Sequence, residues 1–220
     1  MNKQLAKILA GTTLIIMSAG LYTAFREQGA KAFQTSSNIK QFQVTQVANF
    51  PRRGKLRMTY YSWHDNGYLA NNHQPSYDIA YSREKYPRLI YTNAADRRGG
   101  DGSSKFPIIV AVSPTYEGEL PTGTRIYAPH LKKYLIVQDQ CQTPYCEKKQ
   151  GGLLIDVWMY TKPTSDKSKV SKVEECQRKW TGKGFEQAWD VVINPPNDKP
   201  VDTAPFFNPD TNECRTPNFN

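Results

Sequence analysis

Short runs of apolar residues separated by turns fill the middle of the chain. Five such runs occupy residues 57–63, 107–112, 125–127, 134–139 and 153–160. The run at 107–112 (PIIVAV) has the composition of a buried strand, and Pro121 and Gly123 mark a tight turn before the next run. Short strands with turns every 8–12 residues are typical of barrels and sandwiches. The pattern therefore predicts an all-β fold.

The segments on either side of these runs differ in composition. Lys3 and Lys7 precede an apolar run at residues 8–21, which is shorter than the roughly 20 residues of a membrane-spanning helix. We expect residues 1–24 to be a cleaved signal peptide or an uncleaved N-terminal membrane anchor. We expect a polar linker at 25–54, the β-barrel at 55–161, and at 162–220 a C-terminal appendage with one helix and an extended arm. The protein is thus predicted to be exported: periplasmic, secreted, or anchored to the inner membrane facing outward.

The cysteine count agrees with export. Four cysteines behind an export signal indicate two disulfides, and three pairings are open: the cysteines are Cys141, Cys146, Cys176 and Cys214. We favour Cys141 with Cys146, because these two flank a turn, and Cys176 with Cys214, which ties the C-terminal tail to the body. Zinc is the alternative, but the spacings match no common zinc site, so no metal is predicted.

Charge limits the classes of partner. The formal net charge is +9, and anionic cell-wall polymers such as peptidoglycan are natural partners of a basic exported protein. A merely solvated basic surface is the alternative. No aromatic–basic RNA motif and no zinc-finger spacing occur, so we expect no nucleic-acid partner. The sequence does not indicate an oligomeric state.

Two aspartates are the candidate catalytic residues. Asp156 lies inside the apolar run Ile155-Asp156-Val157-Trp158, and Asp139 ends another run. Burial raises the pKa of a carboxyl group, as a general acid near neutral pH requires, and paired carboxylates are the usual equipment for cleaving glycosidic bonds. The structural alternative is an aspartate that faces solvent or accepts backbone hydrogen bonds.

The order of these motifs resembles the three-aspartate (3D) domain, a double-psi β-barrel that also forms the catalytic part of the membrane-bound lytic transglycosylase A family. The matching pieces are Ala111-Val112-Ser113-Pro114, Pro121-Thr122-Gly123-Thr124, Gln138-Asp139 and Ile155-Asp156-Val157. The resemblance spans about fifty residues and implies a six-stranded double-psi barrel. The chain departs from the pattern at Ser113, where the family has its first aspartate, and at Gln140-Cys141-Gln142, which replaces Thr-Gly-Gly.

The resemblance also implies a function. Asp156 would be the single acid/base of a lytic transglycosylase-like enzyme that cleaves peptidoglycan without any cofactor, and Asp139 would support it. Tyr60, Tyr61 and Trp63 are candidate surfaces for stacking sugar rings, with core packing as the alternative. The adjacent His64-Asp65 pair is noted but is not among the predicted site residues.

Two other functions stay open. One is a non-catalytic barrel that binds cell-wall glycan or a protein partner, as the loss of the first family aspartate at Ser113 suggests. The other is a secreted effector or inhibitor, which fits the disulfides and the basic charge equally well.

Overall fold

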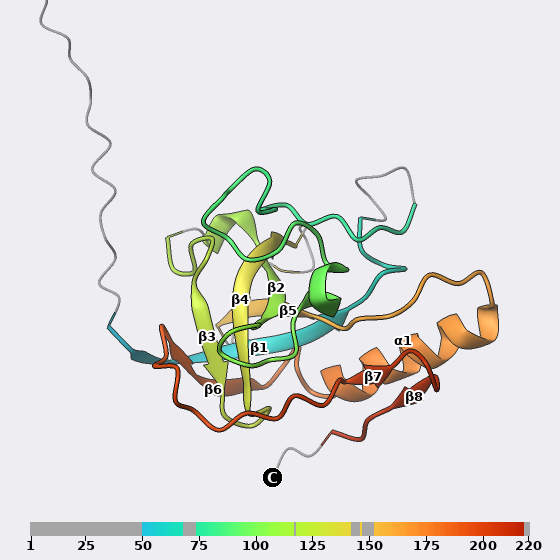
Figure 1. The fold of residues 1–220 in the computed structure, drawn as a ribbon. Coiled ribbons are helices and arrows are strands. Elements are labelled where there is room, and N and C mark those ends of the chain that lie inside the picture. Colours follow the sequence, from blue (N-terminus) through green and yellow to red (C-terminus); the bar gives the residue numbers. More distant parts are fainter. Residues whose placement is uncertain (1–49, 68–73, 117, 142–145, 147–151, 218–220) are drawn as a thin grey trace, which may run out of the picture. The chain divides into compact units, whose positions relative to one another are not determined.

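A computed structural model describes residues 50–67, 74–116, 118–141, 146 and 152–217 (Figure 1). The predicted signal peptide or anchor and most of the predicted linker lie outside the described residues. Within the described part of the chain, no helix combines the length and the hydropathy that crossing a membrane requires.

Six strands form a closed barrel with the order β1-β5-β2-β4-β3-β6. The bounds are β1 Arg52–Tyr61, β2 Ile108–Val112, β3 Arg125–Ala128, β4 Lys133–Gln140, β5 Leu153–Trp158 and β6 Ala188–Ile193. All five residues of β2 are buried, as are the first seven of β4, because loops and the C-terminal arm cover the outside of the barrel while side chains fill its interior.

The strand pairing has an internal symmetry. β1 runs parallel to β5 and antiparallel to β6, while β4 runs parallel to β2 and antiparallel to β3. Exchanging β1, β2 and β3 with β4, β5 and β6 therefore leaves the pattern unchanged, since the β2–β5 and β3–β6 pairs map onto themselves. Two interlocked halves of this kind make a double-psi barrel, and the predicted all-β six-stranded fold is confirmed.

One helix, α1 (Lys167–Thr181), packs against the barrel and contacts β1. Its N-cap Asp166 accepts a hydrogen bond from the backbone N–H of Ser168. Its buried residues follow the three-to-four residue spacing of an amphipathic helix: Val173, Cys176, Gln177 and Trp180. The predicted single helix of the appendage is thus present, and its buried side faces the barrel.

The turn after α1 approaches β1 very closely. A Cβ atom built on Gly184 would lie 1.8 Å from the carbonyl oxygen of Met58. Only glycine therefore permits this approach, and it places the end of the helix against the barrel.

The remaining elements are short. Two 3-10 helices, η1 (Asp96–Gly99) and η2 (Pro114–Tyr116), lie between barrel strands, and β7 (Phe207–Asn208) pairs with β8 (Glu213–Cys214) near α1. The C-terminal arm is held by a buried cation: Nζ of Lys133 donates hydrogen bonds to the carbonyl oxygens of Asp202 and Ala204.

The predicted domain boundaries need two corrections. β1 already begins at Arg52, inside the predicted linker, because residues 52–57 pair with β6. β6 itself lies beyond residue 161, the predicted end of the barrel, and without it β1 and β3 would have unpaired edges. The appendage therefore contributes one barrel strand in addition to its helix and arm.

Both disulfides have the predicted pairing. Cys141 is bonded to Cys146, and Cys176 of α1 is bonded to Cys214 of β8. The second bridge closes a segment of 38 residues and fixes the end of the C-terminal arm to the helix.

Candidate active site

The two predicted catalytic aspartates lie in one row across the barrel. Thr59 on β1 is the register partner of Asp156 on β5, Asp156 pairs with Ala111 on β2, and Ala111 pairs with Asp139 on β4. Strands in a sheet are about 4.8 Å apart, so the backbones that carry the two aspartates are separated by about 10 Å. The register of four strands thus gathers residues that are 97 positions apart in the sequence.

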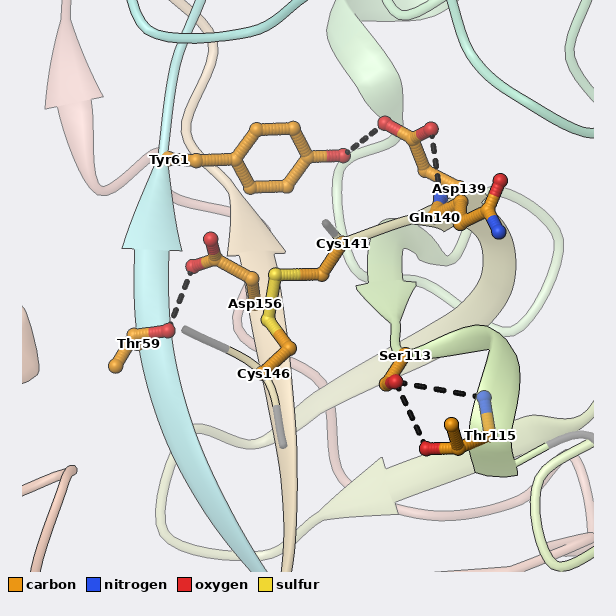
Figure 2. Close-up of a disulfide and its surroundings, with 9 residues drawn as sticks. All are labelled: Thr59, Tyr61, Ser113, Thr115, Asp139, Gln140, Cys141, Cys146 and Asp156. Carbon is orange, nitrogen blue, oxygen red and sulfur yellow. Dashed lines mark hydrogen bonds between the residues drawn. A yellow bond between two sulfur atoms is a disulfide. The ribbon is translucent and has the colours of Figure 1, made fainter. Parts of the chain in front are cut away.

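Asp156 is a half-buried carboxyl group with a fixed orientation. Its Oδ1 accepts a hydrogen bond of 2.8 Å from the hydroxyl of Thr59 (Figure 2). Burial raises the pKa of Asp156 to about 7, and the negative charges of Asp65 and Asp139 add to the effect. At neutral pH this group is therefore protonated in a large fraction of molecules and can donate a proton.

Asp139 is in a different position. It is 4% exposed and accepts hydrogen bonds from the hydroxyl of Tyr61 and from the backbone N–H of Gln140, both at 2.8 Å (Figure 2). A third hydrogen bond, of 2.9 Å, comes from the backbone N–H of Ala80. Burial raises the pKa of Asp139 to about 6. The carboxylate ties β1 and the segment around Ala80 to the end of β4, and it acts on the site through these contacts and through its charge.

A pocket of about 620 Å³ opens beside Asp156. The barrel provides one wall, and α1 with the turn that follows it provides the other. The lining residues are Thr59, Tyr60, Asp65, Cys146, Leu154 and Asp156 on the barrel side, and Glu174, Gln177, Arg178, Thr181, Gly182 and Phe185 on the helix side. Asp139 does not occur among the described residues that line this pocket.

Asp65 also lines the pocket, although the sequence analysis noted it without placing it among the site residues. It follows β1 in the turn after Ser62, and its Oδ1 accepts the Ser62 backbone N–H at 2.6 Å. Gln177 of α1 donates to its Oδ2 at 2.8 Å. Asp65 is an exposed residue that lines the pocket, and the partial burial of its carboxyl group against the turn and α1 raises its pKa. The available signal was its place in a polar turn directly after a strand.

The Cys141–Cys146 disulfide lies against the Asp156 carboxylate. One carboxylate oxygen and the two sulfur atoms are all within 4.8 Å of one another (Figure 2). The two sulfurs are bonded to each other, so they are not thiolates of the kind that bind zinc. The bridge instead forms part of the surface around the carboxyl group.

The three predicted stacking residues have different surroundings. Tyr60 lines the pocket but is 6% exposed, and its ring packs against Trp180 and Phe206. Tyr61 is buried between the barrel core and Asp139. Trp63 is half-buried and packs against Tyr77, and neither of these residues lines the pocket.

Phe185 is an exposed aromatic residue of the pocket. It lines the pocket, 53% of its surface is exposed, and the sequence analysis missed it because it lies in the appendage, 24 positions beyond the expected end of the barrel. Its exposed ring, in the same pocket as Asp156, fits the stacking role for which Tyr60, Tyr61 and Trp63 were the candidates in the sequence analysis.

Ser113 has no part in the pocket. Its hydroxyl is within 2.9 Å of the Thr115 hydroxyl and accepts a hydrogen bond from the Thr115 backbone N–H at the start of η2 (Figure 2). Where the resembled family has its first aspartate, this chain therefore has a buried residue that stabilises a turn.

Fold and site together define the class of protein: a closed six-stranded β-barrel with a carboxyl group opening into a pocket that is completed by a C-terminal helix. The chain belongs to the family described as the DDB_G0273701 N-terminal domain, whose model matches residues 53–215. That range contains five barrel strands and all of β1 except Arg52, together with the helix and both disulfides, so the match extends over the barrel and the appendage.

A relative from Dictyostelium discoideum, "Uncharacterized protein DDB_G0273701/DDB_G0273221", is 29% identical over 133 residues. The match covers 59% of this chain and 53% of that protein, so the chain spans about half the length of the relative. No solved structure gave a significant match. The resemblance to the 3D domain therefore stays a prediction that rests on the motifs.

Proposed function

We propose that this protein is an exported, lytic transglycosylase-like enzyme that cleaves peptidoglycan with Asp156 as its acid/base. The observation that carries the proposal is the state of Asp156: a half-buried carboxyl group with a pKa raised to about 7, oriented by Thr59 and opening into a pocket of about 620 Å³. A general acid needs a pKa near the working pH and access to its substrate, and Asp156 has both.

The reaction follows from one carboxyl group acting twice. The glycosidic C1–O bond breaks, its electron pair goes to the leaving oxygen, and that oxygen takes the proton of Asp156. The 6-hydroxyl of the same muramyl sugar then attacks C1, and its proton returns to Asp156. The products are a free hydroxyl end and a 1,6-anhydro sugar, with no external nucleophile consumed.

Three observations favour a glycan substrate. The exposed ring of Phe185 lies in the same pocket as Asp156 and provides a face for a sugar ring. The basic charge favours an anionic polymer, and the two disulfides favour an oxidising compartment outside the cytoplasm. Peptidoglycan combines sugar rings with negative charge in that compartment.

A non-catalytic glycan-binding barrel is the second candidate, favoured by one observation. The Cys141–Cys146 bridge lies within 4.8 Å of the Asp156 carboxylate and narrows the approach of a substrate oxygen from that side. In this alternative the pocket binds a glycan end, and Asp156 contributes a hydrogen bond without transferring a proton.

The test is incubation of the full-length protein with isolated peptidoglycan and mass spectrometry of the soluble products. We expect anhydromuropeptides from the wild type and none from Asp156→Asn, which keeps the acceptor for Thr59 but has no proton to transfer. Asp190→Asn is the matched control, because it removes an exposed carboxylate from β6, a barrel strand that is not adjacent to β5. Wild-type protein that binds sacculi and releases nothing would establish the binding alternative.

A further inference from the structure

Asp65 and Asp156 are two carboxyl groups in one pocket, brought there by different elements. Asp156 comes from β5, whereas Asp65 comes from the turn after β1, and both line the cavity beside α1. Asp65 is not part of the motifs that carry the resemblance to the 3D domain, and the motif aspartate that this chain lacks corresponds to Ser113, which lies in a separate turn.

Both oxygens of the Asp65 carboxylate accept hydrogen bonds from the protein. Its Oδ1 accepts the Ser62 backbone N–H and its Oδ2 accepts from Nε2 of Gln177, a residue that is 8% exposed. The same Nε2 also donates to the carbonyl oxygen of Tyr60 at 3.2 Å, so Gln177 fixes the carboxylate to both the helix and β1. With both contacts made, Asp65 is still exposed and lines the pocket.

Burial raises the pKa of both carboxyl groups, and their other surroundings differ. Donors on both oxygens of Asp65 oppose the rise and favour its ionised form, while the negative charge of Asp65 favours the protonated form of Asp156. The other ionisable groups around the pair are His64 beside Asp65, Asp139, Tyr60 and Tyr61 on the barrel, and Glu174 and Arg178 on α1. Glu174 and Arg178 have opposite charges and lie on the helix side of the pocket, whereas Asp65 lies in the turn that follows β1.

We propose that Asp65 is the second functional carboxylate of this site: ionised, it stabilises the positive charge that develops at C1 of the sugar while Asp156 transfers the proton. This inference rests on the proposed glycan-cleaving function and names a further residue for it. Asp65 forms no bond and neither gains nor loses a proton. The bonds that break and form are those of the Asp156 cycle alone.

Gln177 is then a positioning residue. It acts through Asp65, because its side chain bridges that carboxylate and β1 from the helix. The helix belongs to the C-terminal appendage. The appendage would therefore both line the pocket and complete the catalytic site. A barrel without α1 would retain Asp156 and lose the orientation of Asp65.

The experiment measures anhydromuropeptide release by full-length wild type, Asp65→Asn, Asp65→Glu and Gln177→Met across pH 4–9, together with sacculus binding and thermal unfolding. Removing one electrostatic stabiliser typically lowers the rate by about 100-fold, which is the loss we expect in kcat for Asp65→Asn, with sacculus binding unchanged. The alkaline limb of its pH profile moves to lower pH, because Asp156 loses a negative neighbour. Asp65→Glu keeps the charge and retains that limb, and Gln177→Met lowers kcat with little change in KM.

Glu175→Gln is the matched control, since it removes a carboxylate from the outer face of the same helix, where Glu175 pairs with Lys179 in solvent. Asp65→Asn with wild-type kcat and an unmoved pH profile overturns the inference and leaves the proposed function standing. A wild type that releases no anhydromuropeptides overturns both. If Asp65→Asn unfolds more easily, the folded Asp65→Glu and Gln177→Met variants decide: wild-type kcat in both, with an unmoved profile, rejects the role of Asp65.

Discussion

The substitution Asp156→Asn is expected to stabilise the protein at alkaline pH and to leave it nearly unchanged at acidic pH. The amide keeps the shape of the carboxyl group and the oxygen that accepts the Thr59 hydroxyl, at 2.8 Å in the wild type. It removes only the buried negative charge. Any pH-dependent difference between the two proteins therefore measures the cost of ionising Asp156 in the fold.

The magnitude follows from the pKa of Asp156, which burial raises from 3.8 to about 7. A group whose pKa is higher in the folded state contributes stability below its unfolded pKa, and this contribution is lost as the pH rises through its folded pKa. The full difference corresponds to about 4 kcal/mol, and partial solvation of the side chain reduces it to roughly 2–4 kcal/mol. For a domain of this size, that range corresponds to a melting temperature about 5–15 °C higher at pH 8.

The assay is thermal or urea unfolding of wild type and Asp156→Asn at pH 4, 6 and 8, with disulfides intact. We expect curves that nearly coincide at pH 4 and separate progressively toward pH 8. The control Asp190→Asn removes an exposed carboxylate paired with Lys55 and should shift stability by less than about 1 kcal/mol at any of these pH values. An equal gain at pH 4 and pH 8 would show that Asp156 is not a buried, protonated acid.

Three further predictions concern the appendage. Gly184→Ala should lower the melting temperature and reduce activity together, because the new Cβ would lie 1.8 Å from the Met58 carbonyl oxygen; thermal unfolding and product release measure the two effects. Replacing Cys176 and Cys214 by serine opens a 38-residue segment and should cost about 4 kcal/mol in urea unfolding, and a loss below about 1 kcal/mol would contradict this estimate. Phe185→Ala should weaken sacculus binding several-fold while the melting temperature stays constant, since the ring is 53% exposed; unchanged binding would exclude the ring as a platform.

Much of the barrel could be predicted from the order of residues alone. The apolar runs at 107–112, 134–139 and 153–160 became β2, β4 and β5, because these runs are short, rich in β-branched residues and bounded by turns. The disulfide pairing was also predictable, since Cys141 and Cys146 flank a turn. The unusual position of Asp156 within an apolar run pointed to a buried acid for the same local reason.

Contacts between residues that are far apart in the sequence were decided by the tertiary structure. β6 closes the barrel although it lies beyond residue 161, the expected end of the barrel. The unpaired edges of β1 and β3 need a partner strand, and the path of the chain decides which segment supplies it. Asp65 meets Gln177 across 112 positions, and Asp139 meets Tyr61 across 78. Local patterns in a sequence report which residues form strands and which side chains are apolar. Strand register and helix docking, which no local pattern encodes, determined which carboxyl group is locked in the core and which two share a pocket.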